Sequence, residues 1–336
     1  MFSELEHRNL ALNILEPAIL ILMASACLVG NSLTCIAVYR NARLRTSTNL
    51  YLIALAASDI INASIVMSLA VGVLITGRWP YGEALCNFHA FFTLFSVYVS
   101  PTTMGLTAYN RYVRIVKSQQ YSRIFTPTRS KMYVAAIWLP VAGYSSIPKL
   151  AGWTEYVFIP GHAACASVHL TETMKITHYS IVVSLFFLLP LGVATVSYYK
   201  VFKKIKQHNQ NLASTNQAED QSSRITAKEI NITKSLAIVV LAFGLCWIPF
   251  WIIIVMQRFT SDAVVPRNVQ LLCTFLLFFS STINPVIYAG MNPSFRAEFR
   301  NTVCCKTRSD DLELNQISAK DQIGRASCRE RVSSPV

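Results

Sequence analysis

The sequence predicts an all-α membrane protein, built as a bundle of seven transmembrane helices followed by a short amphipathic eighth helix. Of its 336 residues, 53% are hydrophobic and only 14% are charged, a balance that is not typical of a soluble chain. Seven apolar stretches each reach the length of about 20 residues that a bilayer requires. Asp59 in the second stretch and Asn284 in the seventh would be costly in lipid without a function, so the helices must do more than anchor the chain.

The apolar stretches set the expected order of elements along the chain. We expect membrane spans near 15–39, 49–76, 87–113, 132–151, 177–201, 232–257 and 268–290. The chain then divides into an extracellular N-terminus, a seven-helix bundle, an amphipathic helix and a cytoplasmic tail, over 1–14, 15–290, 291–303 and 304–336.

The segment 291–303 has the pattern of a helix that lies on a membrane surface. Its apolar residues Phe295, Phe299 and Val303 recur at a spacing of four, which places them on one helix face. Within the tail that follows, residues 323–332 resemble a translated sequencing adapter and carry no functional argument.

Basic residues favour one set of loops. They gather in the segments around 40–45, 111–131, 200–228 and from 296 onward, whereas the opposite loops hold acidic and basic residues in similar number. Basic loops favour the cytoplasm, so we expect a multi-pass plasma-membrane protein with its N-terminus outside. A basic rim beside anionic membrane lipid explains the net charge of +13, and no nucleic-acid partner is expected.

The cysteines separate by compartment under this topology. Cys86 and Cys165 are the two that we place outside, where an oxidising environment favours a disulfide, with two free thiols as the alternative. Cys304 and Cys305 follow the amphipathic segment and are candidate palmitoylation sites, with ordinary free thiols as the alternative.

Short motifs recur in order along the seven stretches. They include Gly30-Asn31, Ala56-Ala57-Ser58-Asp59, Asn110-Arg111-Tyr112, Cys246-Trp247-Ile248-Pro249 and Asn284-Pro285-Val286-Ile287-Tyr288. By these motifs the chain resembles rhodopsin-class (class A) G-protein-coupled receptors over residues 16–305. The resemblance implies a receptor and not an enzyme. It also implies an extracellular ligand, a heterotrimeric G protein as partner, and arrestin and receptor kinases as further partners.

Polar residues from several spans should meet at mid-membrane around Asp59. On facing helices they would give the buried carboxylate hydrogen-bonding partners. In the resembled family such a cluster holds a sodium ion with water, and no other cofactor is expected. The alternative is a packing network without an ion. The expected members are Asp59, Asn31, Ser100, Ser280, Ser281 and Asn284.

The resemblance also implies a conformational switch. Prolines within spans remove a backbone hydrogen bond and create places where a helix bends. An ion pair between Arg111 and Glu229 would hold the inner side closed, and opening would free Arg111 for other partners. The alternative for Arg111 is a solvated basic residue that helps orientation. The expected switch and coupling residues are Asn110, Arg111, Tyr112, Tyr198, Glu229, Phe243, Pro249, Pro285 and Tyr288.

Two residues depart from the pattern of the resembled family. Asn110 stands where the arginine usually has an acidic neighbour, so Arg111 lacks one restraining charge. Pro101 lies in the middle of the third span, where the family more often has a branched apolar residue, and it should bend that helix.

The expected ligand pocket is apolar and aromatic. Thr93 stands where amine receptors of this family keep an aspartate, which disfavours monoamines, and the last span has no lysine for a retinal Schiff base. An uncharged or weakly polar ligand suits such walls. His89 and His178 could hydrogen-bond a ligand, but we expect them to face solvent at the rim. The expected lining is Thr93, Leu94, Val97, Val182, Phe186, Trp247, Phe250, Trp251, Ile254, Thr274 and Phe278, with Tyr98, Val183 and Gln270 beside them.

Within the resembled family, the inner half is similar to melatonin receptors. The similarity lies in Val38-Tyr39-Arg40-Asn41, in Leu44-Arg45 and in the Asn110-Arg111-Tyr112 triplet, whereas Phe186 and Pro148 replace the histidine and asparagine of the melatonin pocket. We therefore expect a melatonin-receptor-like orphan. A receptor fold without G-protein signalling, serving as a dimer partner or constitutive scaffold, is the main alternative. A transporter is less expected, because the chain shows no paired halves.

Overall fold

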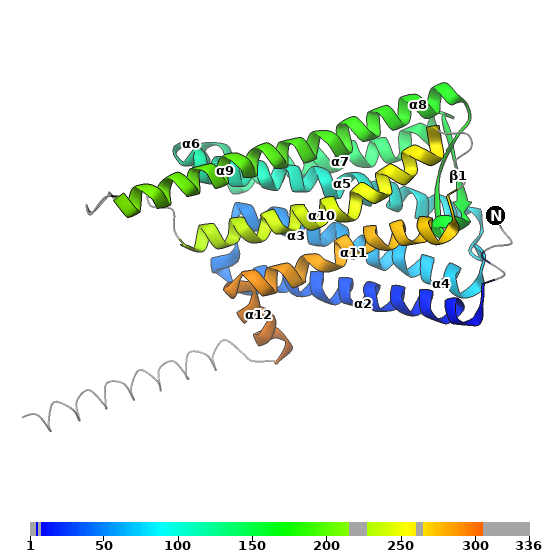
Figure 1. Ribbon diagram of the computed structural model, residues 1–336, viewed down its shortest axis with the longest axis horizontal. Coiled ribbons are helices and arrows are strands. Elements are labelled where there is room, and N and C mark those ends of the chain that lie inside the picture. The colour runs from blue at the N-terminus through cyan, green and yellow to red at the C-terminus, as the bar shows by residue number, and fades with distance from the viewer. Residues whose placement is uncertain (1–4, 6–7, 215–226, 260–264, 305–336) are drawn as a thin grey trace, which may run out of the picture.

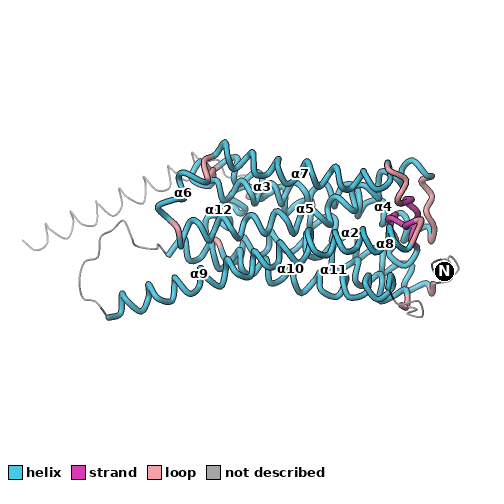
Figure 2. The backbone as a smooth tube through the Cα atoms, turned by 90° about the horizontal axis from the view of Figure 1, so that it is seen from above, coloured by secondary structure: helices cyan, strands magenta, loops and turns pink. Residues whose placement is uncertain are grey.

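The computed structural model describes residues 5, 8–214, 227–259 and 265–304. Long helices run side by side along one axis, and shorter segments join them at the two ends (Figures 1 and 2). They are α2 (Leu10–Arg40), α3 (Ser47–Ile61) with α4 (Ser68–Thr76), α5 (Gly82–Val116), α7 (Pro127–Leu150), α8 (Glu172–Ile181) with α9 (Leu189–Ser214), α10 (Ala227–Phe259) and α11 (Arg267–Met291). The expected seven-helix bundle is therefore confirmed.

Two of the seven helical rods contain a π-helical turn. The turn η2 (Asn62–Met67) joins α3 to α4, and η4 (Val182–Leu188) joins α8 to α9. A π turn rotates the residues that follow it relative to a regular helix, and such turns are frequent at functional sites. Both turns contribute residues to the outer cavity described below.

Five of the rods are apolar and long enough to cross a membrane by length and composition. They cover Leu10–Arg40, Ser47–Thr76, Glu172–Gln210, Glu229–Met256 and Arg267–Met291. The other two, α5 and α7, have 35 and 24 residues, which is also sufficient for a crossing, but they are less apolar. Every expected span lies mostly within one rod. The rods extend beyond the expected spans; α9, for example, continues through polar residues as far as Ser214.

The helix starts follow from local capping chemistry. The Thr126 hydroxyl accepts from the backbone N–H of Arg129 at 3.2 Å, and Pro127 occupies the first position of α7, where no N–H is needed. The Asn292 side chain likewise accepts from the N–H of Ser294 at 3.1 Å, ahead of Pro293 in α12 (Pro293–Val303). Side-chain acceptors thus satisfy N–H groups that the first helical turn leaves without partners.

Pro101 lies inside α5, and helical structure continues on both sides of it. Pro101 borders a narrow internal gap together with Phe187, Pro190 and Phe243. Nearby, a Cβ on Gly105 would come within 3.2 Å of the Pro190 Cα atom, so the glycine permits close contact between α5 and α9.

A β-hairpin that the sequence did not predict covers one end of the bundle (Figure 2). Its strands β1 (Thr154–Ile159) and β2 (Ala164–His169) pair antiparallel, and the turn η3 (Pro160–His162) joins them. The predicted disulfide is confirmed: Cys165 of β2 is bonded to Cys86 of α5, with a Cα–Cα distance of 5.5 Å. The disulfide fixes the hairpin to the helix that carries both Thr93 and Arg111.

Further contacts support the hairpin from α7. The Tyr156 hydroxyl of β1 donates to the Ser145 carbonyl, and the Lys149 ammonium lies 5.2 Å from the centre of the Tyr156 ring. Burial raises the pKa of Tyr156, so the phenol retains the proton that its hydrogen bond requires. The hairpin is therefore held by α5 and α7 together.

At the opposite end lie η1 (Ala42–Leu44), α6 (Ser118–Ile124) and α12. The helix α12 begins two residues later than expected, and its Phe295 packs 5.8 Å from Tyr288 between ring centres. Phe295 is fully buried whereas Val303 is exposed. The expectation that Phe295 and Val303 share one helix face on the membrane surface is therefore wrong for Phe295. The Asn41 amide donates to Glu298 at 2.6 Å and joins α12 to the end of α2.

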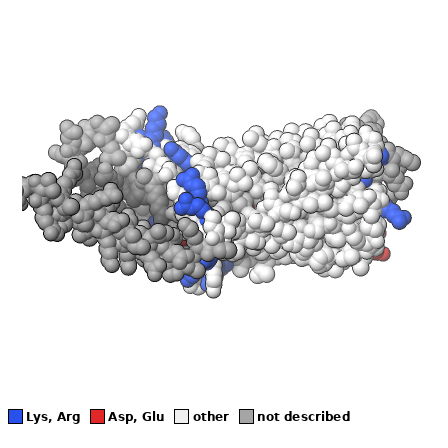
Figure 3. Space-filling model, turned by 90° about the horizontal axis from the view of Figure 1, so that it is seen from below, with Lys and Arg blue, Asp and Glu red and all other residues white. Residues whose placement is uncertain are grey.

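The surface charge is divided along the bundle (Figure 3). On the face shown, lysines and arginines gather towards the end with α6 and α12, a few lie at the hairpin end, and the middle is uncharged. An uncharged belt between polar ends is the surface that a protein crossing a bilayer requires.

Candidate functional site

A cavity lies beneath the β-hairpin, among α5, the α8–η4 rod, α10 and α11. It has about 1000 Å³ of empty space, counting the part that is open to solvent. Ten of the eleven expected ligand-binding residues line it, namely Thr93, Leu94, Val97, Val182, Trp247, Phe250, Trp251, Ile254, Thr274 and Phe278. Their spacing along separate helices brings them to one volume, which fits the walls of a small-molecule pocket.

Phe186 is the exception among the expected ligand-binding residues, because it is absent from the cavity lining. Its ring stacks on Tyr98 with centres 4.8 Å apart, so it supports a wall residue from behind. The π turn η4 is the physical reason, since it changes which residues of this rod face inward. Val183 and Gln270 are also outside the lining, whereas Tyr98 is part of it. Gln270 lies under the hairpin at Gly161, and its side-chain amide donates to the Val265 carbonyl at 2.8 Å.

The hairpin and the π turn η2 add wall residues that sequence reasoning missed. His162, Ala164, Ala166 and Ser167 come from the hairpin, and Asn62 and Val66 come from η2. The His162 ring nitrogen Nδ1 lies 3.0 Å from the Thr274 hydroxyl, so the hairpin contacts α11 across the cavity. The disulfide had predicted that the loop around Cys165 lies over the mouth of the bundle, but not which of its residues line the cavity.

The expected solvent-facing position of the two outer histidines is wrong. His89 is fully buried: its Nδ1 accepts from the Cys165 N–H at 3.3 Å, so its Nε2 carries the proton and donates to the Val66 carbonyl at 3.2 Å. His178 lines the cavity, with Nε2 3.4 Å from the Tyr98 hydroxyl and Nδ1 3.2 Å from the Tyr144 hydroxyl. His89 therefore joins the hairpin to η2, and His178 belongs to the pocket wall.

Among the residues that the structure describes, those lining the cavity include no acidic or basic side chain other than histidine. Thr93 donates its hydroxyl to the His89 carbonyl at 2.8 Å, so this side chain has a backbone partner of its own. Two buried wall groups have no hydrogen-bond partner among the described residues, the Trp251 indole Nε1 and the Ser96 hydroxyl. A buried donor without a partner is costly, and a ligand that accepts a hydrogen bond would remove that cost.

Trp247 connects the floor of the cavity to the interior of the bundle. Its ring stacks on Phe243 with centres 4.5 Å apart, one helical turn away towards the inner end. Its indole Nε1 donates to the Ser280 hydroxyl at 3.1 Å. Pro249 lies two residues further along the same helix, where it removes a backbone hydrogen bond. A ligand that displaces Trp247 would therefore disturb both α10 and α11.

Four of the six polar residues expected at mid-membrane lie close together, namely Asp59, Asn31, Ser281 and Asn284, whereas the Ser280 hydroxyl accepts from Trp247 instead. Asn284 donates its amide to Asp59 Oδ2 at 3.0 Å, and Asn31 donates to the Ser281 carbonyl at 3.1 Å. Ser100 and Ser281 also line the cavity, so the cluster is continuous with the pocket floor. Within the described residues, the Asn31 Oδ1 oxygen is buried without a partner.

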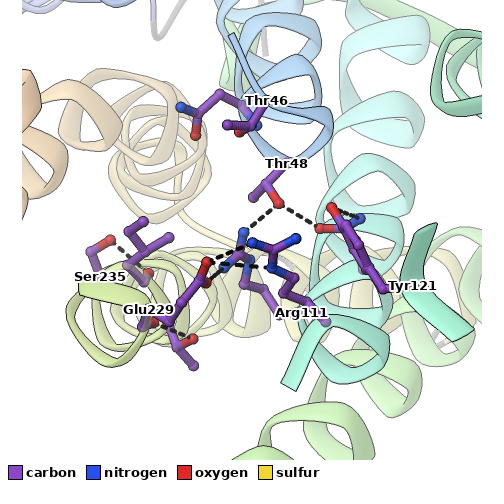
Figure 4. A network of polar contacts seen from close by, with 11 residues as sticks. Thr46, Thr48, Arg111, Tyr121, Glu229 and Ser235 are labelled. Carbon is purple, nitrogen blue, oxygen red and sulfur yellow. Dashed lines mark hydrogen bonds and ion pairs between the residues drawn. The ribbon is translucent and has the colours of Figure 1, made fainter. Parts of the chain in front are cut away.

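Arg111 lies at the inner end of α5 and is almost entirely buried (Figure 4). Its Nη1 donates to Glu229 Oε2 at 2.7 Å, and its Nη2 donates to the Thr48 hydroxyl. Arg114, one turn further, donates to the other Glu229 oxygen at 3.1 Å. The predicted ion pair between Arg111 and Glu229 is therefore present, and it joins α5 to α10.

Asn110 takes part in the same network. The Thr48 hydroxyl donates to Asn110 Oδ1 at 2.8 Å while it accepts from Arg111, and the Asn110 amide donates to the Tyr121 hydroxyl at 3.4 Å. Asn110 therefore restrains Arg111 indirectly, because it binds the Thr48 hydroxyl that accepts from the Arg111 guanidinium. Sequence reasoning missed Thr48 because no motif pointed to it.

Of the remaining switch residues, Tyr198, Pro285 and Tyr288 lie between the polar cluster and Arg111, whereas Tyr112 lines a separate concave surface between α5 and α9. Tyr198 and Tyr288 are buried, and neither hydroxyl has a hydrogen-bond partner within the described part of the chain. Both rings border a narrow internal gap together with Leu236 and Val239 of α10. Pro285 of α11 packs closely on Gly30 of α2, whose Cβ, if present, would lie 2.9 Å from the proline ring. In this arrangement, apolar α10 side chains border the two tyrosines.

The lipid-modification sites are described only in part. Cys304 is exposed and has a free thiol, whereas Cys305 and the tail that follows lie outside the described residues. The adapter-like segment 323–332 lies outside them as well.

Comparisons with known proteins agree with this geometry. Residues 30–288 match the family described as 7 transmembrane receptor (rhodopsin family). The human histamine H2 receptor is 26% identical over 327 residues, covering 93% of this chain and 85% of the relative. Octopamine receptor beta-1R of Drosophila melanogaster is 26% identical, and the match covers 88% of this chain and 62% of that receptor. Octopamine receptor beta-2R of Chilo suppressalis is 25% identical, and the match covers 95% of this chain and 88% of that receptor. These relatives are receptors, not enzymes, and the expected similarity to melatonin receptors is not shown by them. The chain belongs to the rhodopsin family of seven-transmembrane receptors.

Proposed function

We propose that this receptor transmits the binding of an uncharged or weakly polar extracellular ligand to heterotrimeric G proteins. It would do so in the plasma membrane with its N-terminus outside, the orientation that the basic loops favour. The observation that carries the proposal is the series of contacts from the outer cavity to Arg111. Trp247 of α10 lines the cavity and contacts Phe243 and Ser280. Glu229, which lies on the same helix as Trp247, is paired with Arg111 of α5.

The series of contacts suggests a two-state mechanism. Ligand binding against Trp247 would favour an outward movement of the inner half of α10, which carries Glu229. That movement would separate the ion pair and expose Arg111 to a cytoplasmic partner. Arrestin and receptor kinases would act on the tail, which lies outside the described residues.

The pocket chemistry favours an uncharged ligand, although the named relatives are amine receptors. A buried ammonium group needs a countercharge, and the wall residues within the described part of the chain include no carboxylate. The free donors on Trp251 and Ser96 instead suit a ligand with acceptor oxygens. A melatonin-receptor-like ligand remains part of the proposal, supported by the sequence of the inner half alone.

The proposal is tested by G-protein dissociation in cells, measured across the G-protein classes. Full-length receptor at verified surface expression is exposed to neutral lipids, indoles including melatonin, nucleosides and peptides, with histamine and octopamine as charged comparisons. We expect a response to a neutral compound that saturates with dose. No response to any compound, combined with no basal activity in wild type or in a Glu229→Gln variant, would favour the alternative of a non-signalling dimer partner or scaffold.

Replacing Trp251 by phenylalanine tests the proposed acceptor on the ligand. The substitution keeps an aromatic wall but removes the unpaired indole N–H, so the affinity of the active compound should fall by roughly fivefold to tenfold, the value of one hydrogen bond. The measurement is the dose for half-maximal dissociation. Trp153→Phe, in an exposed residue outside the cavity, is the matched control. An unchanged dose–response in Trp251→Phe would contradict the assignment.

We also propose that the Asp59 cluster holds a sodium ion. The donor set fits a hard monovalent cation, because it combines one carboxylate with uncharged oxygens, and Asn31 Oδ1 is buried without a partner among the described residues. Asp59, Asn31, Ser100 and Ser281 would supply the oxygens. A bound cation there would neutralise Asp59 and favour the closed arrangement.

Asp59→Asn should abolish the effect of sodium on agonist binding. The substitution keeps the side-chain size and removes the charge that attracts the ion, so agonist affinity in sodium chloride and in N-methylglucamine chloride should become equal. Ser58→Ala, at the neighbouring buried position whose hydroxyl donates to the Leu55 carbonyl, should retain the sodium effect. A sodium effect that persists in Asp59→Asn would favour a packing network without an ion.

A further inference from the structure

A second concave surface lies on the outside of the bundle, between α5 and α9. It has about 820 Å³ of empty space, counting its open side, and shares no residue with the ligand cavity. Its lining is apolar except at one end, where Ser197 and Lys200 lie. The nine lining residues are Tyr109, Tyr112, Leu188, Leu189, Gly192, Val193, Val196, Ser197 and Lys200. We call this surface the α5–α9 groove.

The α5–α9 groove faces the surroundings of the bundle. Leu188, Leu189 and Val196 expose 54%, 57% and 53% of their surface, which is high for apolar residues. Such residues in a transmembrane helix face lipid, because no water competes there. The natural occupant of the groove is therefore a hydrocarbon chain.

The length of the groove matches one leaflet of a bilayer. Leu188, the last residue of η4, and Lys200 of α9 are twelve residues apart on one continuous rod, which corresponds to about 18 Å of helix. Half of a hydrocarbon core of about 30 Å is about 15 Å. The groove therefore spans one leaflet from the middle of the bilayer to the interface on the side of Arg111.

Positive charge gathers only at the interfacial end. The Lys200 ammonium lies 5.4 Å from the centre of the Tyr112 ring, and the Lys117 ammonium lies 5.8 Å from the same ring on α5. Among the described residues neither lysine forms a salt bridge, and the groove lining has no acidic side chain. Two ammonium groups thus flank one ring at the level of lipid headgroups, where an anionic phosphate would bind.

We propose that the α5–α9 groove is a binding site for an anionic phospholipid of the inner leaflet. One acyl chain lies along Gly192, Val193 and Val196, and the headgroup phosphate binds Lys117 and Lys200. A zwitterionic phospholipid gains the same chain packing but less attraction, since its net charge is zero. The inference rests on the proposed orientation with Arg111 at the cytoplasmic side, and it requires neither a ligand nor a G protein.

The test compares lipids retained by the purified full-length receptor. Receptor is equilibrated in detergent micelles with equal amounts of phosphatidylserine and phosphatidylcholine of the same acyl chains, and retained lipids are counted by native mass spectrometry. We expect phosphatidylserine to be enriched roughly threefold or more over phosphatidylcholine. Equal retention of the two lipids by the wild type would overturn the proposal.

Two variants separate the headgroup from the chain. Lys117→Gln with Lys200→Gln should remove the preference for phosphatidylserine but retain lipid binding. Gly192→Leu should reduce the retention of both lipids by more than half, because a Cβ at 192 meets no atom within 4 Å and the larger side chain would fill the groove. Wild-type retention and preference in either variant would also overturn the proposal.

Matched controls remove charge or add volume elsewhere. Lys234→Gln removes an exposed charge from α10, and Gly290→Leu adds a side chain on α11 where a Cβ also meets no atom within 4 Å. Both should behave as wild type, and loss of the lipid preference in them would overturn the assignment to the α5–α9 groove. Thermal unfolding verifies that each variant is folded. If Gly192→Leu unfolds at a lower temperature than wild type, Val193→Trp replaces it and should likewise reduce the retention of both lipids. No G protein is present in this assay, so equal retention of the two lipids would not contradict the proposed signalling function. Likewise, the absence of G-protein dissociation in cells would not change the interpretation of the lipid measurement.

Discussion

Replacing Arg111 by alanine is expected to abolish ligand-stimulated G-protein dissociation at normal surface expression. Its guanidinium is the buried charge at the inner end of the bundle, it remains protonated at all physiological pH values, and it donates to Glu229 at 2.7 Å. If opening exposes this group to the G protein, alanine leaves no donor there. The maximal response should fall by at least about tenfold, equivalent to about 1.4 kcal/mol of lost coupling.

The control for Arg111→Ala is Arg129→Ala, which removes an exposed arginine at the start of α7 on the same side of the bundle. It should leave the response within about twofold of wild type, since exposed charges contribute little. Surface expression is measured for both variants. An intact response in Arg111→Ala at equal expression would falsify the proposed mechanism.

Replacing Glu229 by glutamine is expected to raise basal G-protein dissociation in the absence of ligand. Glu229 accepts from both Arg111 and Arg114, at 2.7 and 3.1 Å, and glutamine removes the charge while keeping the size. Hydrogen bonds to charged groups contribute about 1.5–3 kcal/mol, and the partial exposure of Glu229 places this pair near the lower limit. The closed state should lose about that much, so the open population rises roughly tenfold.

Glu298→Gln is the matched control for Glu229→Gln, because it makes the same chemical change on α12, where the carboxylate accepts from Asn41 at 2.6 Å. Its basal activity should remain at the wild-type level. The double variant Arg111→Ala/Glu229→Gln should lose the raised basal activity, since the exposed guanidinium is the group that couples. Basal activity in Glu229→Gln equal to wild type would show that this ion pair does not restrain the closed state.

Local patterns predicted a large part of the fold and of the site. Apolar length predicted every transmembrane rod, because lipid requires each crossing segment to satisfy its own backbone hydrogen bonds. The resemblance to rhodopsin-class receptors was sufficient to predict that residues such as Val97, Phe250 and Thr274 line the cavity. Topology alone also paired Cys86 with Cys165, since it left two cysteines outside.

Other features depended on contacts between residues far apart in the chain. The hairpin, the buried state of His89 and the role of Thr48 each involve partners that no local motif identifies. Phe186 was misplaced because a π turn shifts the helical phase, and Phe295 because Tyr288 covers it.

Residue order alone was thus enough to establish a membrane receptor fold, its family motifs and an arginine with an acidic partner. Hydrophobicity and helical periodicity act within a segment, and so they can be read from the printed chain. Assembly of the bundle decided which polar groups meet: Asn110 acting through Thr48, Asn31 beside Ser281, and Lys117 with Lys200 around one tyrosine ring. Such meetings depend on how the helices pack and rotate against each other, and that packing is a property of the whole fold.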